Sequence, residues 1–312
     1  MTTLLFGGAG FVGNNLARKL LNEGHSVAVF DDFSTGRMSN LEDMKDKIVI
    51  KRGDVRDMEA VKNFTDEIKP GAVYFLAALH FIPDCNRDPQ KAFAVNVLGA
   101  KNVIHAAARL QDKPRFIHIS TSSVYRPSDE PIKETHPTEP FEVYGKSKLE
   151  GEGAAREECE KNGMTYFILR PFSIYGPFAG IPQVIPEIVS QLKSGVNSIK
   201  LGNLFPERDF IYVTEVADVL ALLLARGTPG AIYNVGANAV NSIQEVTDII
   251  KDLLKNAGRE VEFISEESRS RGDLERNRLV GDDNKIMQDL DWRPKVTLRG
   301  GLEMLLKAEG LI

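Results

Sequence analysis

Gly7-Gly8-Ala9-Gly10-Phe11-Val12-Gly13 follows the apolar run Thr3–Phe6 and opens a helical pattern. Glycines at these spacings between a strand and a helix are typical of a turn that binds a diphosphate. Gly7 permits the tight turn, Gly10 lets the backbone approach the pyrophosphate, and Gly13 lets the helix pack closely on the strand. The free N–H groups at the start of the helix favour an anion there. The stretch therefore predicts a dinucleotide-binding α/β fold.

An acidic residue at the end of the second predicted strand specifies the dinucleotide. Asp31 follows Ser26–Phe30, at the distance from the glycines at which an acid accepts hydrogen bonds from the adenosine ribose hydroxyls. Its charge would repel a 2′-phosphate, so we predict NAD rather than NADP. The neighbouring candidates for cofactor binding are Phe11, Val12, Asp32, Ser34, Thr35 and Gly36.

The first half of the chain alternates short apolar runs with helical patterns, which is typical of βαβ units. The runs are almost continuously apolar, as expected of parallel strands covered on both faces. We therefore predict a Rossmann-type doubly wound parallel sheet. The predicted strands are Thr3–Phe6, Ser26–Phe30, Lys47–Lys51, Ala72–Ala77, Arg115–Ser120 and Thr165–Arg170, and the longest predicted helices are Gln90–Leu110 and Tyr144–Asn162.

The pattern changes after Arg170-Pro171, where prolines and glycines divide the chain into shorter pieces. We expect an NAD-binding domain over residues 1–170 and a smaller α/β substrate lobe over 171–312. The apolar helix Val213–Arg226 and the strand Ala231–Val235 indicate that residues 203–235 return to the first domain. Two further helices are predicted near Ser242–Asn256 and Leu298–Ala308.

Ligands of open α/β sheets bind at the carboxyl ends of the strands. Asp54-Val55 follows the third predicted strand, and we expect it to meet the adenine edge. Leu76-Ala77-Ala78 ends the fourth, where small residues let the backbone pass close to a cofactor. His80 follows it, and the sequence leaves open whether it contacts the cofactor, contacts the substrate or packs within its loop.

Tyr144-Gly145-Lys146-Ser147-Lys148 opens a helix, and residues four apart share a helix face. Tyr144 and Lys148 therefore point the same way. A tyrosine with its ordinary pKa of about 10 is a poor base, but a nearby ammonium stabilises the phenolate and lowers that pKa. Thr121, just after the fifth strand, can hydrogen-bond the same substrate oxygen. We predict Thr121, Tyr144 and Lys148 as catalytic residues.

These motifs together resemble the extended short-chain dehydrogenase/reductase family, and within it the nucleotide-sugar 4-epimerases of the UDP-glucose 4-epimerase type. The resemblance runs over nearly the whole chain and rests on residues 7–13, Asp31, Ser120-Thr121-Ser122-Ser123-Val124-Tyr125, Tyr144 with Lys148, and Arg170-Pro171-Phe172-Ser173-Ile174-Tyr175-Gly176-Pro177. It implies that Tyr144 takes the proton of the sugar 4-hydroxyl while C4 gives a hydride to NAD, which later returns it to the other face of the 4-keto sugar.

The resemblance also implies further contacts and an assembly. Asn96 matches a position that braces the active site, and Ser120 and Phe172 match cofactor neighbours. In relatives, the helices that correspond to Gln90–Leu110 and Tyr144–Asn162 form an intersubunit four-helix bundle. A homodimer is therefore expected, although burial within one chain also explains much of their apolar pattern.

The expected substrate is a nucleotide-diphosphate sugar, and the resemblance favours a UDP-sugar. Arg208, within the stretch 202–210, is the first candidate for the diphosphate, since a guanidinium suits bidentate phosphate contact. Pairing with Glu207 or Asp209 is the alternative for this arginine. A second family arginine site corresponds to 269–273, with Ser270 where the arginine usually stands. The remaining candidates for substrate binding are His80, Thr121, Ser122, Tyr144, Ser173, Arg271 and Asp273.

Other reactions of the family stay open. Sugar 4,6-dehydratases carry an Asp-Glu pair where this chain has Ser122-Ser123, and the decarboxylases carry Glu in place of Ser123, so both activities are disfavoured. A 4-keto nucleotide-sugar reductase would use the same Tyr144 and Lys148, but such reductases commonly prefer NADPH, which Asp31 opposes. A non-catalytic dinucleotide sensor would be expected to lose the pair.

The composition excludes several classes. The net charge of −5 gives no general affinity for nucleic acid. Two cysteines exclude a disulfide framework and a cysteine-based metal site, and we expect them reduced in a cytoplasmic protein. No metal is expected. The first residues show no basic segment of a signal peptide, and no apolar run reaches the length of about 18 residues that a membrane span needs.

Overall fold

The computed structural model describes residues 1–180, 182–269 and 276–312. Its centre is a sheet of seven parallel strands in the order β11-β6-β5-β4-β1-β2-β3, which confirms the predicted Rossmann-type sheet. The strands are β1 (Thr2–Phe6), β2 (Ser26–Asp31), β3 (Ile48–Arg52), β4 (Ala72–Phe75), β5 (Arg115–Ile119), β6 (Tyr166–Pro171) and β11 (Ile232–Val235).

Helices cover both faces of this sheet, because its strands are apolar on both sides. One hydrophobic core joins the sheet to α1, α8 and α10, and a second joins it to α2, α5 and α6. Their bounds are α1 (Phe11–Asn22), α2 (Met58–Ile68), α5 (Gly99–Ala108), α6 (Val143–Lys161), α8 (Val213–Arg226) and α10 (Asn284–Leu290).

The helix expected over Gln90–Leu110 is interrupted by a π-helical turn. It consists of α4 (Pro89–Phe93), the π turn η2 (Ala94–Leu98) and α5. A π turn adds a residue to one helical turn and changes which side chains face the neighbouring elements. Here the turn contains Asn96, which is fully buried.

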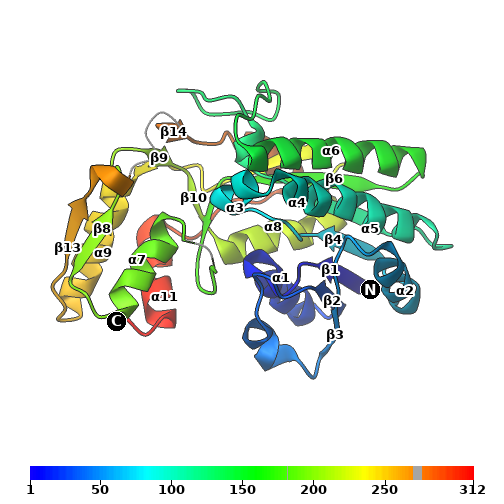
Figure 1. The fold of residues 1–312 in the computed structure, drawn as a ribbon, viewed down its shortest axis with the longest axis horizontal. Helices are drawn as coiled ribbons and strands as arrows, with labels where there is room; N and C mark the ends of the chain where they lie inside the picture. Colours follow the sequence, from blue (N-terminus) through cyan, green and yellow to red (C-terminus); the bar gives the residue numbers. More distant parts are fainter. Residues whose placement is uncertain (181, 270–275) are drawn as a thin grey trace.

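A smaller lobe has a hydrophobic core of its own. Figure 1 shows it at the left, with α7, α9 and α11 beside the parallel pair β8 and β13. Ser242 caps α9 in a capping box with Glu245, which explains why that helix begins where the sequence indicated. The bounds are α7 (Val184–Lys193), β8 (Ser198–Leu201), α9 (Ile243–Asn256), β13 (Glu262–Ser265) and α11 (Leu298–Ala308).

Short strands connect the lobe to the large sheet. β7 (Ser173–Tyr175) pairs with β10 (Phe210–Tyr212), and β9 (Glu207–Arg208) lies between β12 (Asn241–Ser242) and β14 (Arg278–Leu279). β11 lies beside β6 at the edge of the large sheet, while the boundary at residue 170 stays a prediction. The remaining elements are η1 (Met38–Met44), α3 (Ile82–Arg87), η3 (Ser122–Val124) and η4 (Glu267–Arg269).

Candidate active site

A single cavity of about 680 Å³ collects most of the predicted site residues. It runs from the glycine-rich turn, past the carboxyl ends of the sheet strands, to residues of the smaller lobe. The predicted residues that line it are Gly7, Gly10, Phe11, Val12, Gly13, Asp31, Asp32, Ser34, Thr35, Asp54, Val55, Leu76, Ala77, Ala78, His80, Ser120, Thr121, Ser122, Tyr144, Lys148, Phe172, Ser173 and Arg208.

Two predicted cofactor contacts lie behind the wall of this cavity. Gly36 packs against the glycine turn, where an added Cβ would lie 2.7 Å from the carbonyl carbon of Ala9. Asn96 is buried and braces the loop after β4: its Oδ1 accepts from the Leu79 N–H at 2.9 Å, and its Nδ2 donates to the Ser147 hydroxyl at 2.8 Å. Both support the site without facing it. Arg271 and Asp273 fall outside the described residues.

The glycine turn has the close contacts that its sequence predicted. Gly7 has a φ of 87°, a region that favours glycine, and a Cβ there would lie 2.6 Å from the Ala77 nitrogen. A Cβ on Gly13 would lie 2.3 Å from the Gly7 carbonyl oxygen. Only a backbone without side chains fits between β1, β4 and the start of α1. The turn therefore fits a diphosphate at a helix N-terminus.

Asp31 is held by two backbone N–H groups. Its Oδ2 accepts from Ala9 and its Oδ1 from Phe33, each at 2.8 Å. Burial raises the pKa of Asp31, and these two hydrogen bonds oppose that shift. Each carboxylate oxygen keeps acceptor capacity for another donor. The pair of oxygens beside the turn therefore fits a ribose diol.

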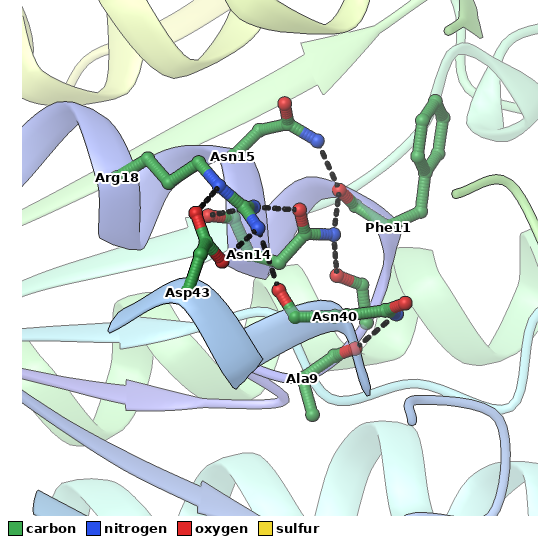
Figure 2. Close-up of polar contacts among 8 residues, drawn as sticks. Ala9, Phe11, Asn14, Asn15, Arg18, Asn40 and Asp43 are labelled. Atoms are coloured by element: carbon green, nitrogen blue, oxygen red, sulfur yellow. Dashed lines mark hydrogen bonds and ion pairs between the residues drawn. The ribbon is translucent and has the colours of Figure 1, made fainter. Parts of the chain in front are cut away.

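A polar network, shown in Figure 2, fixes the segment after β2 to this turn. Asn40 donates to the Ala9 carbonyl at 2.9 Å, and Arg18 donates to the Asn40 carbonyl at 2.8 Å. Arg18 also pairs with Asp43, with 2.6 Å between Nη2 and Oδ1. Asn40 also lines the cavity, and it is not among the residues predicted from the sequence. Nothing in the local sequence marks it, because its partners lie 22 and 31 residues away.

The predicted catalytic pair stands at the start of α6, with Thr121 beside it at the end of β5. The sequence predicted that the Lys148 ammonium lowers the pKa of Tyr144. In the protein without bound nucleotide this direction is wrong. Burial raises the pKa to about 12, and the hydrogen bond with the Thr121 side chain only partly offsets this. Loss of hydration on burial is the largest cause of this shift. Tyr144 is thus a phenol that needs further positive charge to ionise.

Lys148 is 2% exposed, and burial lowers its pKa to about 8, while Glu152 acts in the opposite direction. Glu152 is itself committed to Arg170, with 2.5 Å between Oε2 and Nη2. Ser120 also donates to Glu152. This buried ion pair joins α6 to β6 directly behind the catalytic residues.

The structure revises the expected surroundings of other candidates. Asp54, expected at the adenine edge, pairs with Arg56 at 2.5 Å while still lining the cavity. Arg208 donates to the Glu207 carbonyl at 2.8 Å. Asp209, the alternative partner of Arg208, accepts instead from the Ala237 N–H at 2.7 Å. His80 faces the cavity, and burial lowers its pKa, which favours the neutral ring.

Several residues that line the substrate end were not anticipated. Phe141 and Glu142 precede the catalytic helix, and Arg276 enters from the segment before β14. Arg276 is remote in sequence from the other catalytic-end residues, so no spacing rule marks it. Phe141 and Glu142 were detectable only as immediate neighbours of the Tyr144 motif.

The described part of the chain contains no cluster of three or more His, Cys, Asp or Glu side chains that could hold a metal ion. Among the same residues, no helix is both long and apolar enough to cross a membrane.

Comparison with known proteins places the whole chain among enzymes that modify nucleotide sugars. The family model described as GDP-mannose 4,6 dehydratase matches residues 4–305. A UDP-glucose 4-epimerase from Mycolicibacterium smegmatis is 30% identical over 97% of this chain and 96% of its own length. A human dTDP-D-glucose 4,6-dehydratase is 28% identical over 97% of this chain and 88% of its own length. A Thermus thermophilus UDP-glucose 4-epimerase, solved in complex with NAD, is 29% identical with a TM-score of 0.87, over 99% of both chains.

Proposed function

Because the chain belongs to the extended short-chain dehydrogenase/reductase family, among the enzymes that modify nucleotide sugars, we propose that it is an NAD-dependent 4-epimerase of a nucleotide-diphosphate sugar. The observation that carries this proposal is the single cavity in which Thr121, Tyr144 and Lys148 lie next to the dinucleotide turn. Both epimerases and dehydratases are among its relatives, so the choice of reaction rests on the residues of this chain.

NAD is the cofactor that these residues fit. The glycine turn and the start of α1 would receive its diphosphate, and Asp31 would accept from the ribose hydroxyls while repelling a 2′-phosphate. When bound, NAD supplies reversible hydride acceptance and a positive charge on its nicotinamide ring. Lys148 would hydrogen-bond the nicotinamide ribose.

Tyr144 would act as the base that takes the proton of the sugar 4-hydroxyl and later returns it. Its pKa of about 12 leaves it protonated at neutral pH in the protein itself. The charges of Lys148 and of the bound cofactor would favour the phenolate. Thr121 would hydrogen-bond the same sugar oxygen and hold it in place. The 4-keto sugar formed in this way would rotate in the cavity, so that its opposite face is presented for reduction.

The absence of acids next to Thr121 favours epimerisation over dehydration. Ser122 is buried and Ser123 is half-buried, and both line the cavity. Dehydration requires a group that protonates the departing hydroxyl, and a serine hydroxyl is too weak an acid to supply that proton. Decarboxylation is disfavoured as well, because this chain has Ser123 where the decarboxylases carry a glutamate.

A substrate with a diphosphate is supported by Arg208, which lines the cavity together with Ser173. We propose Arg208 as the diphosphate contact, with Ser122, Ser173 and His80 around the sugar. Arg271 and Asp273 stay candidates from the sequence. UDP is the nucleotide that we propose, since it is the one named for the epimerase relative.

A reductase of 4-keto sugars is the second candidate, because it would use the same Tyr144 and Lys148. Purification separates the two activities. An epimerase should retain NAD, which is released on denaturation and detected by its absorbance. A reductase should be isolated without nucleotide and should consume NADPH when given a 4-keto sugar.

The direct test is turnover of UDP-, dTDP- and GDP-sugars, followed by proton NMR of the anomeric region. Tyr144→Phe should abolish turnover, since the ring stays but the transferable proton is lost, while NAD binding remains. The exposed Lys146→Met on the same helix is the control and should keep activity. Near-normal turnover by Tyr144→Phe would overturn the proposed role of this residue.

We also propose a homodimer in the cytoplasm. Most apolar residues of the two predicted interface helices, such as Val103 and Ala155, are buried within one chain, but Leu98 is 48% exposed. Both cysteines are free thiols, as expected in a reducing compartment. A molar mass of one chain, measured by light scattering, would contradict the proposed dimer.

A further inference from the structure

Arg276 is a cavity-lining cation that the proposed chemistry does not use. It lies two residues before β14, whose Arg278 is paired with Glu207 of β9. Its Nη2 donates to the Ser123 carbonyl at 2.9 Å, and its guanidinium lies 4.9 Å from the centre of the Phe141 ring. Both contacts fix the planar group in one orientation.

These contacts place Arg276 at the sugar end of the cavity. A Cβ added to Gly145 would lie 2.7 Å from the Ser123 carbonyl oxygen, the same oxygen that Arg276 binds. The guanidinium is therefore anchored at the corner between the Thr121 turn and the residue that follows Tyr144. Arg208, the candidate for the diphosphate, is on β9 instead.

The guanidinium of Arg276 has no directly bonded counter-ion within the described ranges, although the charge of Glu142 acts on it from farther away. No carboxylate there lies within ion-pairing distance, and its buried Nη1 has no hydrogen-bond acceptor among those residues. Arg269, which also lines the cavity, pairs with Glu266 at 3.2 Å. Burial lowers the pKa of Arg276, and the charge of Glu142 opposes this. A half-buried cation is stabilised by an anion that hydrogen-bonds it directly, and a sugar hydroxyl offers it only a neutral acceptor.

We propose that Arg276 binds a carboxylate on C5 of the sugar, so that the preferred substrate is a nucleotide-activated uronic acid. C5 is next to C4, the carbon that is oxidised beside Tyr144 in the proposed function, on which this inference rests. A planar guanidinium matches a carboxylate through two parallel hydrogen bonds. Arg276 is thus a specificity residue, which touches the substrate away from the reacting atoms.

The test compares UDP-glucuronate and UDP-glucose in the NAD-loaded protein. These two probes differ only in the substituent on C5, which is a carboxylate in the first and a hydroxymethyl group in the second. Their dissociation constants are measured by calorimetry in the Tyr144→Phe background, where turnover does not interfere. UDP-glucuronate should bind more tightly, by about 10- to 100-fold, the range expected for hydrogen bonds between charged groups. Arg276→Gln should remove this preference and leave the affinity for UDP itself within about twofold.

Two further variants sharpen the result. Arg269→Gln, at an arginine that is already paired, should keep the preference, and Arg276→Lys should keep part of it because the charge remains. The inference is overturned if the native residue gives no preference for the uronate, or if Arg276→Gln weakens UDP as much as UDP-glucuronate. The second outcome would place Arg276 on the diphosphate. Epimerisation of UDP-glucose by a protein without that preference would leave the proposed function standing.

Discussion

Lys148 shows how a single catalytic residue opposes folding. It is almost completely buried, and burial lowers its pKa from 10.5 to about 8. In the protein without nucleotide, the unfolded chain therefore binds more protons than the folded chain between these two pH values. The free energy of unfolding should rise with pH across that window and be lowest, for this group, below it.

Replacing this lysine should separate stability from activity. Lys148→Met keeps an unbranched side chain without the charge, so it should raise the free energy of unfolding at pH 7 by up to about 3 kcal/mol, at about 1.4 kcal/mol per pKa unit. Turnover should be lost. Urea unfolding of the nucleotide-free protein at pH 7 and pH 10 measures the effect, which should shrink at the higher pH.

The exposed Lys146→Met is the matched control and should change stability little at either pH. If Lys148→Met were less stable than the native protein at pH 7, favourable interactions of the ammonium, such as its attraction to the charge of Glu152, would outweigh its loss of hydration.

At the scale of elements, one buried ion pair fixes the catalytic helix to the sheet. Glu152 on α6 accepts from Arg170 on β6 and from Ser120 after β5, and the Arg170 guanidinium lies 4.7 Å from the centre of the Tyr125 ring. Both charged side chains are at most 5% exposed. Removal of one partner would leave the other charge buried and unpaired.

Glu152→Gln should therefore destabilise the protein by about 3–5 kcal/mol. Thermal and urea unfolding measure this loss directly. Glu150→Gln, at an exposed position of the same helix, should stay within about 0.5 kcal/mol of the native protein. A loss as small as that for Glu152→Gln would show that Arg170 finds another partner.

The same scale shows a limit of prediction from sequence. Apolar periodicity predicted one helix over Gln90–Leu110, because a π turn leaves both flanking segments helical and apolar. The turn contains Asn96, which contacts Leu79 and, on α6, Ser147. Local propensity contains no information about partners 17 and 51 residues away.

At the scale of the whole molecule, two buried carboxyls lie where the lobe and the sheet domain meet. Asp209, between β9 and β10, is fully buried, and its Oδ2 would lie 2.0 Å from a Cβ on Gly236. Asp283 precedes α10 and is also fully buried. Burial raises the pKa of Asp209 to about 6 and that of Asp283 well above its ordinary value, with Asp209 adding to the second shift.

A raised carboxyl pKa means that the folded chain binds more protons than the unfolded chain. Stability from these groups should therefore fall as the pH rises from about 4 through the folded values. Asp283→Asn should raise the melting temperature at pH 8 by about 2–4 °C or more, and the gain should shrink towards pH 5. Calorimetry at both pH values measures this, with the exposed Asp46→Asn as the control. An equal gain at both pH values would contradict a titrating pair.

The sequence by itself determined the sheet, the dinucleotide turn and the pair Tyr144 and Lys148. Each depends on spacing within one short segment, where periodicity and steric demands act directly. Only the tertiary structure decided what surrounds these groups. It placed Arg276 beside Ser123, buried Glu152 against Arg170, and raised the pKa of Tyr144 through burial. Burial and charge depend on side chains that folding brings together from distant segments. These properties of the active site therefore could not be predicted from the sequence alone.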